Sequence, residues 1–132
     1  MNFMFYDCYN LTSLDLSIFD TSSVEYMVSM FSGCNKLKYI NVSGFNTSSV
    51  TDMYGMFEYC YSLTSLDLSN FDVSKVTDFR NMFIYCYSLN YLNIFNFTTT
   101  SSFTQYFTYM FTGISNNNNE FQYCLKEDNY FF

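Results

Sequence analysis

Hydrophobic residues recur along the chain with a period of 26 residues. The pair Met-Phe opens each copy, at Met4-Phe5, Met30-Phe31, Met56-Phe57 and Met82-Phe83, and returns at Met110-Phe111. A fixed period this long is typical of arrays in which each repeat forms one coil of a stack. We therefore expect one repeat domain over residues 1–114, with coils starting near residues 4, 30, 56, 82 and 110.

Each repeat contains the signal of a short strand. The apolar positions are Leu11/Leu14/Leu16, Leu37/Ile40/Val42, Leu63/Leu66/Leu68 and Leu89/Leu92/Ile94. The last two members of each set alternate with polar residues, which predicts a half-buried strand. A phenylalanine follows each strand, and we expect it to turn inward at the corner of the coil.

A second pattern follows the corner. Val50, Met53 and Phe57 lie at i, i+3 and i+7, and Val24/Met27/Phe31 and Val76/Phe79/Phe83 repeat this spacing. This is one face of a short helix, and the Asn46-Thr47-Ser48-Ser49 segment before it suits a helix N-cap. In the longer fourth repeat, Phe103, Phe107 and Met110 can serve the same face. The sequence therefore predicts an α/β solenoid with one short strand and one short helix per 26-residue coil.

The pattern decays at the carboxyl end. The leucine expected after Met110 is replaced by Asn117, inside a run of four asparagines. We expect residues 115–132 to be a degenerate segment, either a cap or a loop. At the other end, Met1 occupies the repeat position of Met27, so we expect the chain to start inside a repeat of a longer array. Uncapped apolar end coils would favour end-to-end self-association.

Residues that flank the strand leucines should project to an open face. One column reads Ser13, Tyr39, Ser65 and Tyr91, and the other reads Asp15, Asn41, Asp67 and Asn93. These eight residues are the candidate interaction surface, because tyrosine covers much area at small entropic cost. The alternation of acids with amides keeps like charges off neighbouring strands. The alternative is that the tyrosines only cover the apolar core.

Cysteine also follows the repeat, at Cys8, Cys34, Cys60 and Cys86. We interpret these residues as small buried hydrophobes that form a structural ladder. A metal site is disfavoured, because the chain has no CxxC motif and no histidine. Disulfides between neighbouring coils remain open.

Composition limits the partners and the chemistry. The net charge is -7 with five basic residues, which argues against nucleic acid and anionic membranes. No apolar stretch approaches ~20 residues, so no membrane insertion is expected, and Met1–Asn10 shows no secretory signal. Without histidine no Ser-His or Cys-His pair can form. Asp15 and Asp67 should lie roughly 10 Å apart, two strands away from each other. We expect no catalytic, metal-binding or cofactor-binding residues.

The repeat resembles the 26-residue repeat of BspA-like leucine-rich-repeat surface proteins. The motif is carried by Met56-Phe57, Cys60, Leu63–Ser69 and Phe71-Asp72, with Thr47-Ser48 and Val50–Met53 from the preceding copy. The resemblance covers roughly residues 1–114. It implies a leucine-rich-repeat-like solenoid, exposed at the cell surface or secreted and linked to adhesion. It brings no catalytic residues.

The sequence thus predicts a non-catalytic interaction or adhesion module that binds a protein or a glycan through its open strand face. One alternative is a set of structural spacer coils that bind nothing. A hydrolytic enzyme is the remote alternative, since it would need a cleft of converging carboxylates.

Overall fold

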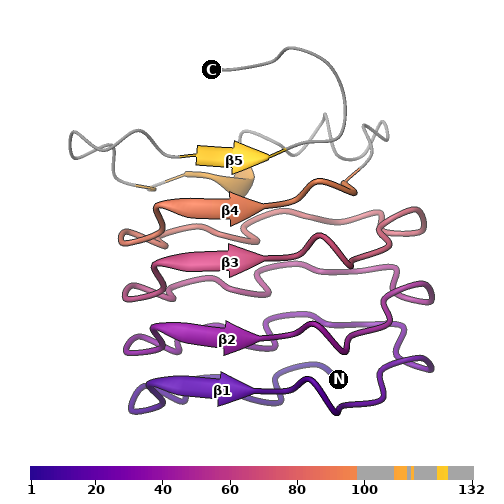
Figure 1. The fold of residues 1–132 in the computed structure, drawn as a ribbon, viewed down its shortest axis with the longest axis horizontal. Coiled ribbons are helices and arrows are strands. Elements are labelled where there is room, and N and C mark those ends of the chain that lie inside the picture. The colour runs from indigo at the N-terminus through magenta and orange to yellow at the C-terminus, as the bar shows by residue number, and fades with distance from the viewer. Residues whose placement is uncertain (98–108, 113, 115–121, 125–132) are drawn as a thin grey trace.

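The computed structural model describes residues 1–97, 109–112, 114 and 122–124. It contains five short parallel strands, which are β1 (Ser13–Asp15), β2 (Tyr39–Asn41), β3 (Ser65–Asp67), β4 (Tyr91–Asn93) and β5 (Gln122–Cys124). Successive repeats form coils that lie one above the other, with the strands in chain order along the stack (Figure 1). The 26-residue period sets the register, because Leu14 lies opposite Ile40 and Leu66 opposite Leu92.

β5 falls within the segment that the sequence predicts to be a cap or a loop. Its backbone pairs with β4, and Tyr123 lies opposite Leu92. The rest of that segment, residues 115–121 and 125–132, lies outside the described residues.

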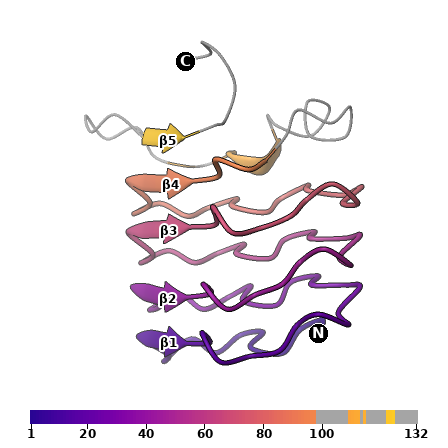
Figure 2. The ribbon, with the colours of Figure 1, turned by 45° about the vertical axis from the view of Figure 1, so that its right-hand side comes forward.

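Opposite the strands, the chain forms a second wall. The stretch of each repeat that builds it is here called the return segment, for example residues 24–34, which lead from the first coil into the second. Figure 2 shows this wall running behind the strands. Met27 N–H donates to Asp52 O at 3.0 Å, and Met53 N–H donates to Asp78 O at 3.0 Å. Isolated parallel bridges join Tyr26 to Asp52 and Asp52 to Asp78. The coils are therefore hydrogen-bonded to one another on the return side as well.

The predicted helix is wrong for the return segments within residues 1–97, since no helix is found there, and most of the segment predicted to be helical in the fourth repeat lies outside the described residues. The N–H groups of the return segment alternate instead of pairing four residues back. Met27, Ser29, Phe31 and Gly33 donate to carbonyls of the next coil, whereas Met30, Ser32 and Cys34 each donate to the carbonyl three residues before them. The prediction of an α/β leucine-rich-repeat-like solenoid is therefore wrong, and the described coils consist of short strands and turns.

Left-handed backbone conformations explain why a helix cannot form there. Two equivalent positions of the repeat have positive φ. The first is occupied by Phe3 (58°), Ser29 (49°), Gly55 (58°) and Asn81 (61°). The second, four residues later, is occupied by Asp7 (55°), Gly33 (77°), Tyr59 (60°) and Tyr85 (61°). Two such residues four positions apart interrupt a right-handed helix. The inward side chains keep their helix-like spacing, because Met27, Met30, Phe31 and Cys34 are all buried.

The core consists of columns of identical or similar side chains. Phe5, Phe31, Phe57, Phe83 and Phe111 form a continuous stack with ring centroids 5.2–5.9 Å apart. The strand leucines and the corner phenylalanines complete the interior, and Phe45, Phe71 and Phe97 are buried as their position predicts. Offset stacked rings contribute packing beyond their buried area.

Polar side chains in the corners form hydrogen bonds with backbone groups. Thr21 is fully buried; its Oγ1 donates to Asn46 O at 2.9 Å and accepts from Asn46 N–H at 2.8 Å. Thr47 Oγ1 donates to Asp72 O at 2.9 Å. Asp20 caps the same turn by accepting from Ser22 N–H at 3.0 Å. The segments expected to cap helices therefore close turns.

We predict that Phe57→Ala lowers the free energy of unfolding by about 3–5 kcal/mol, because it leaves a cavity in the middle of the ring stack. Denaturant-induced unfolding measures the loss. Ile18 is 91% exposed, so Ile18→Ala is the matched control and should change stability by less than about 0.5 kcal/mol. Equal effects of the two substitutions would contradict the stacked core.

Acid should destabilise the turns. The pKa of Asp15 is lowered by the N–H and hydroxyl of Ser17, that of Asp20 by the hydroxyl and N–H of Ser22, and that of Asp72 by the N–H and hydroxyl of Ser74. A carboxyl whose folded pKa is depressed stabilises the fold above its unfolded pKa, and that contribution is lost as the pH falls through the folded pKa.

The midpoint of denaturant unfolding should therefore fall as the pH decreases below about 4. The triple variant Asp15→Asn, Asp20→Asn, Asp72→Asn keeps the acceptor oxygens, as Asn41 and Asn46 do naturally. It should fall less steeply over the same range. An identical acid profile in the variant would show that these turns do not govern acid stability.

Candidate functional site

The structure places the eight predicted surface residues along the outer face of β1–β4. Within each strand the central residue points inward and its two neighbours point outward. Tyr39 and Tyr91 are 56% and 44% exposed, and Ser13 and Ser65 are also exposed. Asp15 and Asp67 are exposed, whereas Asn41 and Asn93 are half-buried.

The Asp/Asn column ends each strand with the same turn. One side-chain oxygen accepts from the N–H two residues further on, at 3.0 Å for Asp15, 3.1 Å for Asn41, 2.9 Å for Asp67 and 3.1 Å for Asn93. This local bond is available to Asp and Asn alike, which accounts for their interchange. The column thus builds the strand ends, a structural role that was not predicted from the sequence.

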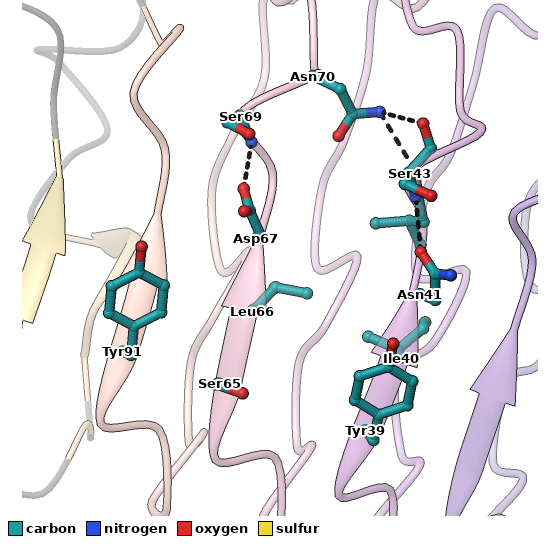
Figure 3. Close-up of a pocket in the computed structure, with 11 residues that line it drawn as sticks. Tyr39, Ile40, Asn41, Ser43, Ser65, Leu66, Asp67, Ser69, Asn70 and Tyr91 are labelled. Atoms are coloured by element: carbon teal, nitrogen blue, oxygen red, sulfur yellow. Dashed lines mark hydrogen bonds between the residues drawn. The ribbon is translucent and has the colours of Figure 1, made fainter.

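The strand wall is interrupted between β2 and β3. β1 and β2 form one sheet, and β3, β4 and β5 form another. A groove of about 310 Å³ lies at this interruption. It is lined by backbone and side chains of both strands and of the turns after them, with Tyr91 at its edge (Figure 3).

Figure 3 shows how the labelled side chains surround the groove. Tyr39 and Tyr91 lie on either side of Ser65, and both rings are seen nearly flat-on from outside the sheet. Asp67 lies further along β3, where its carboxylate accepts from Ser69 N–H. Aromatic surface and polar groups therefore meet on one rigid face.

Asn70 closes one end of the groove. Its Nδ2 donates to Val42 O at 3.2 Å, Ser43 O at 3.3 Å and Phe45 O at 3.1 Å. The same repeat position in the second coil is Gly44, where a Cβ would lie 1.9 Å from Ser17 O. Glycine thus lets the second coil lie directly against the first, while an amide fastens the third coil to the second. Asn70 is not among the residues predicted from the sequence, although its difference from Gly44 at the same repeat position is visible there.

The groove is acidic rather than basic. Among the described residues, the ion pair found is between Arg80 and Asp78, at 2.6 Å on the return side. Lys36 Nζ donates to Asn10 Oδ1 at 3.0 Å, beside the first coil. Asp67 is therefore the charged side chain among the residues that line the groove.

The cysteine column lies in the core. Cys34, Cys60 and Cys86 are buried, and their Sγ atoms donate to Phe5 O, Phe31 O and Phe57 O at 3.1, 3.3 and 3.1 Å. All three are free thiols, as is Cys8, which is exposed at the first coil. Burial raises the pKa of Cys34 to about 11 and that of Cys86 to about 12. Thiols in this state are poor nucleophiles and poor metal ligands.

No cluster of three or more His, Cys, Asp or Glu side chains that could hold a metal ion occurs in the part of the chain that the structure describes. Asp15 and Asp67 belong to strands two coils apart, and each accepts from its own turn. The described residues also contain no helix that is long and apolar enough to cross a membrane.

A second aromatic cluster lies beside the cysteine column. Tyr59 stacks on Tyr85 with centroids 5.1 Å apart, and Tyr61 stacks on Tyr87 at 5.4 Å. The rings stack across the coils, and Tyr59, Tyr61 and Tyr87 are still exposed at 37%, 37% and 49%, so this cluster both packs between coils and lies at the surface. The pair on the strand face, Tyr39 and Tyr91, is separated by Ser65.

Comparison with known proteins found one relationship. A search of curated proteins and a search of solved structures each returned no match. A family model described as "Mycoplasma protein of unknown function, DUF285" matches residues 1–123. Because the match extends over most of the chain, the protein belongs to the DUF285 family.

Proposed function

We propose that the protein is a non-catalytic binding module, which engages a protein or a glycan through the open strand face. The observation that carries this proposal is the groove between β2 and β3, with two exposed tyrosines beside it. Concave sites that combine aromatic surface with a few polar groups are the usual form of binding sites.

Rigidity supports a role in binding. Tyr39 and Tyr91 belong to strands whose neighbours hold them in register, at the pairs Ser13–Tyr39 and Ser65–Tyr91. A ring held on a fixed strand loses little entropy on binding. Side chains on regular elements are also positioned more reproducibly than those on loops.

We further propose that the module acts at a cell surface or in secreted form, as part of a BspA-like repeat protein. The support is the resemblance of the 26-residue motif, together with membership of the DUF285 family. The net charge of -7 makes a polyanionic partner unfavourable, since binding would bring like charges together.

Spacer coils are the second candidate. The specific observation in their favour is that every member of the Asp/Asn column is used in its own turn. Because each of these Asp and Asn side chains stabilises its own turn, their presence on the face does not require a ligand. The two proposals differ in whether Tyr39 and Tyr91 contact a binding partner.

The proposal predicts that beads coated with the protein are retained on cultured epithelial cells, and that Tyr39→Ala with Tyr91→Ala reduces retention at least about tenfold. Two aromatic contacts worth more than ~1 kcal/mol each suffice for that reduction. The matched control is Tyr9→Ala with Tyr26→Ala, since these tyrosines are similarly exposed, at 56% and 49%, and lie outside the groove.

Circular dichroism melting should show that both double variants remain folded. Retention that is the same for the wild type and both folded variants would favour spacer coils. Treatment of the cells with protease or with glycosidases before the assay separates protein partners from glycan partners.

A further inference from the structure

The interruption between β2 and β3 exposes peptide groups that a continuous sheet would pair. Leu16 N–H donates to Asn41 O at 2.9 Å, so the Asn41 peptide faces β1. Because successive residues of a strand turn their N–H and C=O to opposite sides, the Ile40 peptide faces β3. On β3, Leu68 N–H donates to Asn93 O at 2.7 Å, so by the same alternation Ser65 and Asp67 face β2.

These peptide groups have no ladder partner across the interruption, since β2 and β3 belong to different sheets. Ile40 is largely buried, at 6% exposure. Backbone donors and acceptors in a partly enclosed place need partners, which are supplied by water or by a ligand. The groove therefore offers both N–H donors and C=O acceptors.

The width of the interruption restricts what can enter. Residues of β2 and β3 still approach within 8 Å between Cα atoms. A polypeptide strand inserted between them would need a separation of about 9.6 Å, twice the ~4.8 Å spacing of paired strands. A third strand is thus excluded, whereas a hydroxyl group or a water molecule fits.

Charge and hydrogen-bonding capacity narrow the ligand further. The Asp67 carboxylate disfavours an anion. An ammonium or guanidinium group only donates hydrogen bonds, so it leaves the N–H groups of the groove unpaired. An uncharged polyol both donates and accepts, and can satisfy peptide N–H, peptide C=O, Asp67 and the hydroxyl of Ser65 together.

The tyrosines supply the apolar half of such a site. Both rings turn a flat side outward on either side of Ser65 (Figure 3). They lie two strands apart, which corresponds to about 10 Å at the spacing of a regular sheet. A sugar ring has an apolar face of C–H groups that packs on the electron-rich face of an aromatic ring, and its rim carries hydroxyls.

We propose that this face binds a neutral glycan, with sugar rings packed on Tyr39 and Tyr91 and hydroxyls bonded to the peptide groups of β2 and β3. This inference rests on the proposed binding function and names its ligand class. A volume of about 310 Å³ is at the lower end of ligand sites, so the groove takes a short glycan epitope.

The test is an array of neutral di- to tetrasaccharides of glucose, galactose, mannose and N-acetylglucosamine, printed beside sialylated and sulphated counterparts. Titration calorimetry follows with the strongest neutral binder. We expect Tyr91→Ala to weaken binding at least about tenfold and Tyr91→Phe by less than about threefold, because the ring face carries the contact. Tyr26→Ala should bind as the wild type does.

Asp67→Asn separates a glycan from a cationic ligand. Asn41 and Asn93 already end their strands with the same turn, so the substitution should leave the fold intact. Affinity for a neutral glycan should change by less than about threefold, whereas affinity for a tetra-arginine peptide would fall about tenfold if charge governed binding.

Binding of tetra-arginine in place of every neutral glycan, with loss on Asp67→Asn, would overturn the inference. The glycan inference would also be overturned if no glycan bound while retention on cells still depended on Tyr39 and Tyr91. In that case the proposed binding function would hold, with a protein as the partner. If neither glycans nor cells are bound, the binding function itself fails.

Discussion

The alternation of backbone N–H groups along the return segment is the constraint on which the rest of the structure depends. One N–H reaches the next coil and the following one closes a turn within its own coil, as for Phe31 and Ser32. This arrangement includes two left-handed residues four positions apart in each coil, at about 1–2 kcal/mol each for residues other than glycine. Gly33 and Gly55 relieve that cost, whereas Tyr59 and Tyr85 carry it and offset it through their ring stack.

Once coils are held in this way, each side chain packs against its own repeat equivalent. Phenylalanine tolerates that arrangement by stacking, and cysteine and threonine by donating to a carbonyl of the neighbouring coil. Neighbouring carboxylates repel each other, which is consistent with the change from Asp67 to Asn93 on the paired strands β3 and β4. On the return side Asp52 and Asp78 do occupy one column, and there Arg80 forms an ion pair with Asp78. The repeat therefore selects residues by their compatibility with a copy of themselves.

The sequence predicted the strands well because strict alternation of apolar and polar residues suits a half-buried strand and little else. Leu66 and Leu92 lie inward and opposite each other, as their alternation indicates. The helix was wrong because alternating turns place Met27, Met30, Phe31 and Cys34 inward with the same spacing as a helix. Gly33, Gly55 and Asn81 were the sequence signal against a helix, since glycine and asparagine favour left-handed conformations.

The groove could not be predicted, because the strand residues on both sides of it follow the same repeat as those of the paired strands. Its existence depends on how far the second and third coils lie apart at the strand wall. The residue outside the strands does not explain this, since Asn70 and its repeat equivalent Asn96 both donate to the preceding coil, whereas β3 and β4 are paired. The return wall continues across this point, with Phe31 N–H bonded to Met56 O. The strand wall can therefore open without separating the coils. The proposed site combines two tyrosine rings with peptide groups of β2 and β3, and peptide groups leave no trace in side-chain identity, so the sequence alone indicates the repeat and the tyrosines but not the groove.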